Sequence, residues 1–222
     1  DIYTALPKFK ATFAVATRAK TGNDVTGDAF GDVCTEKGVA IILSDGMGTG
    51  EEARRESLKT VELAESFFKA ALTGKTITEL MDTVFLNDSD VFATADILET
   101  DLYDGKARFI KTGAAPSFVI RDGRIRTMRS SALPPGFGAE TETKVTEVNL
   151  KDGDIIIMMT DGVIGNLEAG KDEGKWVKAT VEGLNSKDPR FIADSIIKEA
   201  ERSRGIVSDD MTVAVVRIWE PI

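Results

Sequence analysis

The chain has 222 residues, of which 42% are hydrophobic and 29% are charged, and these proportions are ordinary for a globular protein. Its formal net charge of −9 argues against nucleic acid as the main partner, because phosphate backbones are bound by stripes of lysine and arginine. The chain has no histidine and a single cysteine, Cys34, which excludes Ser-His-Asp and Cys-His catalysis, an internal disulfide and a cysteine-rich zinc site. Any hydrolytic chemistry must therefore use carboxylates, lysines or metals.

The length suits one domain, and we expect residues 1–222 to form a single domain excised from a longer chain. No segment reaches the ~18 consecutive apolar residues of a membrane span, so we expect no membrane contact by this domain.

The first half of the chain predicts two strands followed by two helices. Apolar residues stand near alternate positions over residues 9–19, which is typical of a strand, and the continuous apolar run at 38–43 predicts a buried strand. Apolar residues then recur at helical spacing over 58–71, with Gly74 as the expected end of that helix. A second helix is expected to start at Thr76, with a capping box.

Short strands and turns are predicted from residue 95 to residue 150. The Asp-Gly pairs at 104–105, 122–123 and 152–153 lie between alternating segments, as hairpin turns do. A second continuous apolar run, at 155–159, predicts another buried strand.

Two helices and one strand are predicted to complete the chain. The first helix covers residues 176–184, and the second begins at Asp188, an N-cap that is followed by proline. A strand over 211–218 follows. Because strands and helices do not alternate regularly, this order predicts an α+β layered domain with largely antiparallel sheets.

Two further Asp-Gly pairs, Asp45-Gly46 and Asp161-Gly162, each directly follow a predicted buried strand. A carboxylate in this position is held at the edge of a sheet, while the glycine lets backbone approach a ligand and offers its carbonyl oxygen. Asp28 at the start of a predicted strand fits the same pattern.

The pair Asp209-Asp210 opens the last predicted strand and adds further carboxylates to the set. Carboxylates clustered without histidine or thiolate favour Mg²⁺ or Mn²⁺. Aspartate at a strand end is also ordinary turn chemistry, and spacing alone leaves both interpretations open.

Four motifs occur in order along the chain: Thr26-Gly27-Asp28, Ser44-Asp45-Gly46-Met47-Gly48-Thr49-Gly50, Met159-Thr160-Asp161-Gly162 and Asp209-Asp210-Met211-Thr212. They resemble the ordered motifs of the metal-dependent (PPM) protein phosphatases. The stretches 111–118, 133–136 and 208–213 are similar to the phosphatase domains of the stage II sporulation protein E branch. The resemblance runs from about Gly22 to Ile218.

This resemblance implies two antiparallel β-sheets packed face to face and flanked by helices. It also implies two bound Mn²⁺ or Mg²⁺ ions, with Asp45 bridging them and the Gly46 carbonyl on one of them. Asp161 and Asp210 would hold the other ion, and Asp28 would support the first, directly or through water. Because adjacent residues of a strand point to opposite faces, only one of Asp209 and Asp210 is expected to face the metals.

The implied activity is hydrolysis of phosphoserine or phosphothreonine by a metal-activated water, without a covalent enzyme intermediate. Animal relatives place an arginine near the phosphate and a histidine near the leaving group. Arg18 is a candidate for the arginine, and the missing histidine leaves water to protonate the leaving group.

The implied substrate is a small regulatory phosphoprotein, an anti-sigma factor antagonist in sporulation. The implied full-length protein is membrane-anchored through segments outside this chain, and a homodimer is a candidate assembly. Two alternatives stay open: the same chemistry in a stress-response pathway, and a non-catalytic binding module of the same fold. The predicted helices over residues 51–93 directly follow Asp45-Gly46, so a shift of these helices could change metal affinity and regulate the enzyme.

Overall fold

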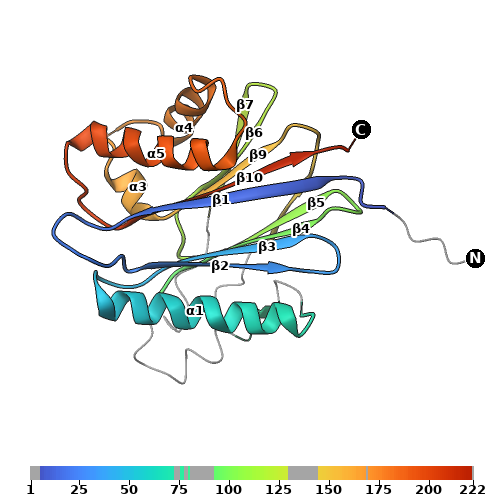
Figure 1. The fold of residues 1–222 in the computed structure, drawn as a ribbon, viewed down its shortest axis with the longest axis horizontal. Helices are drawn as coiled ribbons and strands as arrows, with labels where there is room; N and C mark the ends of the chain where they lie inside the picture. Colours follow the sequence, from blue (N-terminus) through green and yellow to red (C-terminus); the bar gives the residue numbers. More distant parts are fainter. Residues whose placement is uncertain are drawn as a thin grey trace, which may run out of the picture.

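The computed structural model describes residues 6–72, 76–77, 80, 93–129, 145–168 and 170–221. Two five-stranded antiparallel sheets lie face to face, with helices on both outer sides (Figure 1). The first sheet has the order β1 (Lys10–Arg18), β10 (Met211–Trp219), β9 (Ile155–Met159), β6 (Ser117–Arg121), β7 (Arg124–Met128). The second sheet has the order β2 (Asp28–Cys34), β3 (Val39–Asp45), β4 (Ala95–Asp101), β5 (Lys106–Thr112), β8 (Val145–Asn149). The predicted fold class is therefore confirmed.

The helices divide between the two outer faces. In Figure 1, α1 (Glu51–Lys69) covers the second sheet, while α3 (Asp161–Gly165), α4 (Glu173–Glu182) and α5 (Pro189–Arg204) lie on the side of the first sheet. No helix within the described residues is long and apolar enough to cross a membrane.

This layering explains the two continuous apolar runs of the sequence. In β9, Ile156 and Met158 belong to the core between the sheets, whereas Ile155, Ile157 and Met159 pack in the core beneath α4 and α5. Both faces of the strand are therefore buried, so no position alternates to a polar residue. The same holds for β3, which contributes one face to the inter-sheet core and the other to the core beneath α1.

Local signals define most of the helix ends. Asp188 caps α5, its carboxylate accepting a hydrogen bond of 2.8 Å from the Phe191 N–H, and left-handed Gly205 (φ 75°) ends the helix. The prediction that the helix over 58–71 ends at Gly74 was wrong. The helix ends at Lys69, and left-handed Ala71 (φ 59°) turns the chain away. Most of the predicted helix from Thr76 lies outside the described residues.

The Asp-Gly pairs differ in what they connect. Asp122-Gly123 forms the two-residue β6–β7 hairpin, and both residues have positive φ (47° and 68°), as this turn requires. Asp104-Gly105 lies in the connection between the paired strands β4 and β5. The hairpin predicted at Asp152-Gly153 was wrong, because this turn leads from β8 in the second sheet to β9 in the first.

Candidate metal centre

The second sheet brings Asp28 and Asp45 together. Asp28 is the first residue of β2 and Asp45 the last of β3, and they are direct cross-strand partners. The backbone of Asp45 is fixed by Thr94, whose hydroxyl accepts from the Asp45 N–H at 3.0 Å. Two carboxylates directly opposite each other destabilise a sheet unless their charge is compensated.

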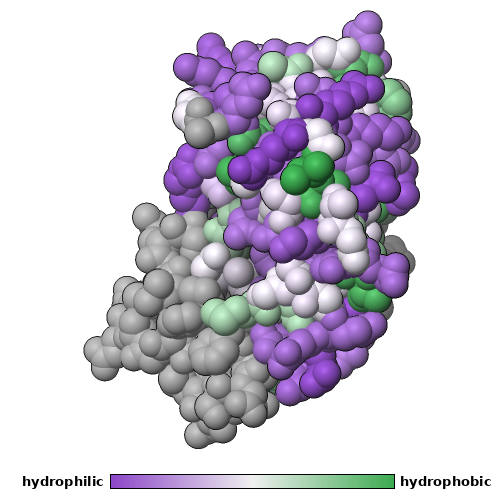
Figure 2. Space-filling model, turned by 90° about the vertical axis from the view of Figure 1, so that its left-hand side faces the viewer, coloured by the Kyte–Doolittle hydropathy of each residue, from purple (hydrophilic) through white to green (hydrophobic). Residues whose placement is uncertain are grey.

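The first sheet brings Asp161 and the Asp209-Asp210 pair to the same end of the sandwich. Asp161 is the first residue of α3, separated from β9 by Thr160 alone, and Asp210 directly precedes β10. These strands are antiparallel neighbours, and the Thr160 N–H donates to the Thr212 carbonyl at 3.0 Å. This end lies at the left of Figure 1, and Figure 2 looks onto it; the described surface there is mainly hydrophilic.

Hydrogen bonds tie the two sheets together at this end. The Thr160 hydroxyl donates to Asp28 Oδ2 at 2.8 Å and accepts from the Thr212 N–H at 2.9 Å. The Gly27 N–H donates to Asp210 Oδ2 at 2.7 Å. Carboxylates from four separate positions in the sequence therefore meet where both sheets end.

The close approach of these carboxylates makes their ionisation costly. Burial, followed by the charges of Asp28 and Asp161, raises the pKa of Asp45 to about 9, and the Asp161 carboxyl lies close enough to share a proton with it. Burial is also the main cause that raises the pKa of Asp28 to about 6, with the Asp210 and Asp161 charges adding to it. An ionised cluster of this kind requires a compensating positive charge.

The residues present fit a hydrated divalent cation. Asp28 Oδ1 is buried and has no hydrogen-bond partner, so it is available to a cation or to a water bound to one. Among the described residues, no three aspartate, glutamate or cysteine side chains lie close enough together to hold a metal ion by themselves, so water would have to supply most of the ligands. Mg²⁺ keeps several waters and commonly uses only one or two protein carboxylates, so an open arrangement suits it.

Two glycines let backbone segments meet at the centre. A Cβ on Gly46 would lie 1.9 Å from the carbonyl oxygen of Ala53 in α1, and a Cβ on Gly162 would lie 2.0 Å from that of Asp210. The sequence interpretation assigned these glycines to close approach of a ligand. The structure shows that they also permit close approach of α1 to β3 and of α3 to the start of β10.

Asp209 and Asp210 have different environments. Both carboxylate oxygens of Asp210 accept backbone hydrogen bonds of 2.7 Å, from the N–H groups of Lys20 and Gly27. Asp209 is half-buried, and its charge contributes to the raised pKa of Asp45. Burial, with the nearby Asp161 and Asp210 charges, raises the pKa of Asp209 as well. Asp209 is thus the residue of the pair whose charge acts on Asp45, while both oxygens of Asp210 are occupied by backbone N–H groups.

Known proteins are similar to this chain over nearly its whole length. The sequence model of the family described as Stage II sporulation protein E (SpoIIE) matches residues 35–219 of this chain. Stage II sporulation protein E of Bacillus subtilis (strain 168) is 34% identical over 214 residues, which are 95% of this chain and 26% of that protein.

This chain belongs to the SpoIIE family.

Solved structures agree with the family assignment. The PP2C phosphatase domain of SpoIIE from Bacillus subtilis, solved with a fragment of its regulatory domain, superposes with a TM-score of 0.89 at 32% identity. The match covers 97% of this chain and 64% of that one. RsbX, crystallised in complex with magnesium, shares the fold with a TM-score of 0.71 at 18% identity, over 94% of this chain and 95% of that one. The SpoIIE-family chain thus has the fold of the PP2C-type, or PPM, phosphatases.

Sequence reasoning assigned no role to a buried ionic network beside the centre of this SpoIIE-family domain. Lys111 forms an ion pair with Asp96, its cross-strand partner, and donates to the Ser117 hydroxyl at 2.8 Å, which in turn donates to Asp96 at 3.0 Å. Both charged side chains are 3% exposed. Burial raises the pKa of Asp96 and lowers that of Lys111, and each partner's charge opposes the other's shift.

This network reaches the metal centre through a small cavity. The cavity, of about 20 Å³, is lined by Asp96 together with Asp45, Thr160 and Asp161. It has room for about one water. The signal for the network in the sequence is a charged residue inside each of two otherwise apolar strand segments, 95–98 and 109–111.

Arg18, the predicted candidate for phosphate binding, forms an ion pair of 2.6 Å with Glu201 of α5. Its side chain is therefore oriented by the helix on the outer face of the first sheet, and its assignment to phosphate stays a prediction.

Proposed function

We propose that this SpoIIE-family domain is a metal-dependent protein serine/threonine phosphatase. The observation that carries the proposal is the convergence of Asp28, Asp45 and Asp161 with Asp209 at one end of the sandwich. Burial and the neighbouring charges raise the pKa values of Asp28, Asp45 and Asp209. Such a cluster is stabilised by divalent cations, and its oxygen-only donors favour Mn²⁺ or Mg²⁺.

The proposed cation ligands are Asp45, the Gly46 carbonyl and Asp161, with Asp28 acting directly or through water. Asp209 or Asp210 completes the set, and the hydrogen bonds of Asp210 favour Asp209. Two ions bound here would supply a water of lowered pKa and positive charge facing the phosphoryl oxygens. Thr160 would orient Asp28, and Thr94 would fix the backbone of Asp45.

The proposed reaction is hydrolysis of a phosphoserine or phosphothreonine ester, in which water attacks phosphorus and the side-chain oxygen leaves with a proton taken from water. The chain has no histidine for that proton transfer. The proposed substrate, by family resemblance, is a small regulatory phosphoprotein, an anti-sigma factor antagonist. A sporulation role is preferred over a stress-response role because the identity with SpoIIE is 34%.

The proposal is tested by phosphate release from a phosphoserine protein, with and without Mn²⁺, for wild type and Asp45→Asn. Activity should require Mn²⁺ and should fall by about 10²-fold or more in the variant, because a ligand is lost at the reacting centre. Asp32→Asn is the matched control, since Asp32 is an exposed residue of β2 remote from the cluster. Mn²⁺-independent activity, or equal activity of Asp45→Asn and wild type, would refute the proposal. Mn²⁺ binding without phosphate release would instead indicate a binding module.

A further inference from the structure

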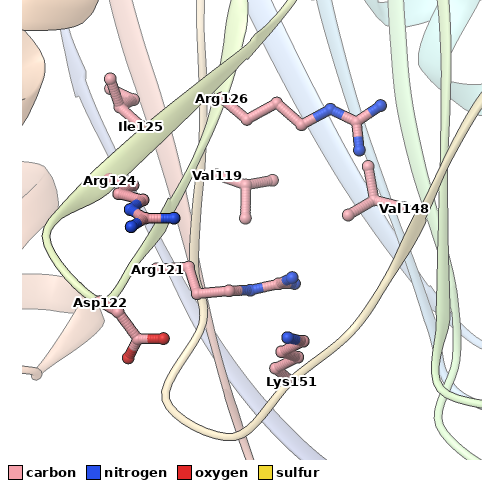
Figure 3. Close-up of a pocket in the computed structure, with 8 residues that line it drawn as sticks. All are labelled: Val119, Arg121, Asp122, Arg124, Ile125, Arg126, Val148 and Lys151. Carbon is pink, nitrogen blue, oxygen red and sulfur yellow. The ribbon is translucent and has the colours of Figure 1, made fainter.

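A groove lined by basic residues lies at a corner of the sandwich, far from the metal centre. It has a volume of about 460 Å³ and lies between β7, an edge strand of the first sheet, and β8, an edge strand of the second. We call it the basic groove and define it by its lining residues, which are four cations, one carboxylate and three apolar side chains: Arg121, Arg124, Arg126, Lys151, Asp122, Val119, Ile125 and Val148 (Figure 3).

The arginines of the basic groove occupy positions that normally carry apolar residues. Val119 of β6 belongs to the core between the sheets, so Arg121, two residues further, lies on the same face. The register places Arg126 opposite Val119 and Arg124 opposite Arg121. Like charges directly opposite each other are destabilising, so this arrangement costs stability.

Two carboxylates, buried Asp154 and exposed Asp122, lie beside the four cations, so the groove keeps a net positive charge. Arg121 is held by buried Asp154 through hydrogen bonds of 2.7 and 2.6 Å, and it also donates to the Asn149 carbonyl. Arg124, Arg126 and Lys151 are exposed, and none of the ion pairs found among the described residues involves them. The chain as a whole has a net charge of −9, so it repels acidic ligands over most of its surface. A locally positive site such as this groove attracts them.

Protection of a sheet edge explains only part of this pattern. An inward-pointing charge on an edge strand discourages pairing with other chains. Either Arg124 or Arg126 alone would be enough for this protection. Arg121, however, lies on β6, one strand in from the edge, and Lys151 lies outside the strands. Cations from three segments therefore border one groove, which points to a ligand.

The layout of the groove indicates the form of that ligand. In Figure 3 the charged ends of Arg121 and Lys151 point to the same area, whereas those of Arg124 and Arg126 lie on other sides of Val119. The four cations therefore do not converge on one point, as a single phosphate would require. Arg124 and Arg126 are two residues apart on β7, about 6.8 Å, which matches the side-chain repeat of an extended peptide. Val119 and Val148 provide an apolar floor between the cations.

We propose that the basic groove binds an extended, acidic polypeptide segment of a partner protein, with alternating carboxylate and apolar side chains. Because β7 is an edge strand within the described part of the chain, the segment can also pair with its backbone. This site is separate from the metal centre: Ile120, beside Arg121, pairs with Ile155 at the start of β9, whereas Asp161 follows the opposite end of that strand. The inference does not depend on phosphatase activity.

The test measures fluorescence anisotropy of a labelled ten-residue peptide of alternating glutamate and valine. The variants are Arg124→Glu/Arg126→Glu and a control, Lys198→Glu/Arg202→Glu, which makes the same change in net charge on exposed positions of α5. Thermal melting establishes that each variant is folded. We expect the groove variant to bind the peptide at least about tenfold more weakly than wild type, with the control unchanged, and binding to weaken as salt rises from about 50 to 200 mM.

Three results would overturn the proposal. Equal weakening in both variants would show a general charge effect, and no binding by wild type would remove the site. Displacement of the peptide by stoichiometric inorganic pyrophosphate would identify a small-anion site. A peptide with serine in place of glutamate should bind no more tightly to wild type than to the groove variant.

Discussion

The environments of Asp209 and Asp210 predict different consequences for the same substitution. Asp209→Asn should lower Mn²⁺ affinity at least about tenfold without destabilising the metal-free fold, because it removes charge facing Asp45 and Asp161. Asp210→Asn should destabilise the fold by about 1–3 kcal/mol, because an amide can accept only one of the hydrogen bonds from Lys20 and Gly27.

Isothermal titration calorimetry with Mn²⁺ and urea denaturation in EDTA separate these two effects. If Asp210→Asn abolished Mn²⁺ binding without loss of stability while Asp209→Asn bound normally, the sequence-based assignment of Asp210 as the ligand would be upheld.

The buried pair of Asp96 and Lys111 shows what residue patterns alone could not reveal. Sequence motifs predicted the carboxylates at strand ends, because each follows or precedes a recognisable apolar run. A charged residue inside an apolar strand segment marks each member of the pair, but it does not indicate the partner. Its role depends on the cross-strand register that places Asp96 beside Lys111, and that register is a long-range property of the fold.

At the scale of elements, the contact between α1 and the end of β3 predicts a sharp response to Gly46→Ala. The added Cβ would lie 1.9 Å from the Ala53 carbonyl oxygen, so either α1 or the Asp45-Gly46 segment must move. We expect a loss of about 1–3 kcal/mol in the free energy of unfolding, with weaker Mn²⁺ binding because Asp45 moves with its neighbour.

Gly165→Ala is the control for this substitution. A Cβ at Gly165, in α3, meets no other atom within 4 Å, so the same change should be neutral or stabilising by up to about 1 kcal/mol. Denaturation midpoints and Mn²⁺ titrations of the two variants give the comparison. Unchanged metal affinity in a folded Gly46→Ala protein would count against coupling between α1 and the metal centre, and against the proposed switching role of the helices that follow Gly46.

Elements were predicted best where local signals decide them. Burial of both faces of a strand gives a continuous apolar run, which predicted the strands at 38–43 and 155–159. Aspartate before proline predicted the N-cap at Asp188. The five-residue helix α3 was missed, since so short a segment carries no periodicity. The chain does turn at Asp152-Gly153, as its residues predict. The predicted hairpin was wrong because packing against distant parts of the chain places the next strand in the other sheet.

On the scale of the whole molecule, the candidate metal centre lies at one end of two sheets that are held together by apolar packing and by a few hydrogen bonds. Asp28 and Asp45 come from the second sheet and Asp161 and Asp209 from the first, so repulsion among them opposes the face-to-face packing of the sandwich. Cation binding removes this repulsion. Metal binding should therefore increase the free energy of unfolding. Without cations, the same carboxylates should destabilise the folded state.

This linkage predicts the pH dependence of stability in EDTA. Asp45 has its pKa raised from 3.8 to about 9 in the folded protein, so between these values the folded state holds a proton that the unfolded chain has released. Stability should accordingly fall as pH rises from 5 to 8, by no more than about 1.4 kcal/mol per pH unit for this one proton. Asp45→Asn cannot release that proton, so its stability should depend less on pH and exceed that of wild type at pH 8.

Urea denaturation at a series of pH values, in EDTA and in excess Mg²⁺, measures both sides of the linkage. Excess Mg²⁺ should stabilise wild type at pH 8, by about 2.7 kcal/mol at one hundred times the dissociation constant, and should leave Asp45→Asn nearly unchanged. Parallel pH profiles for wild type and variant would show that the carboxylates do not repel one another in the folded state. Equal stabilisation of both proteins by Mg²⁺ would place the cation away from Asp45, at a site that does not join the two sheets.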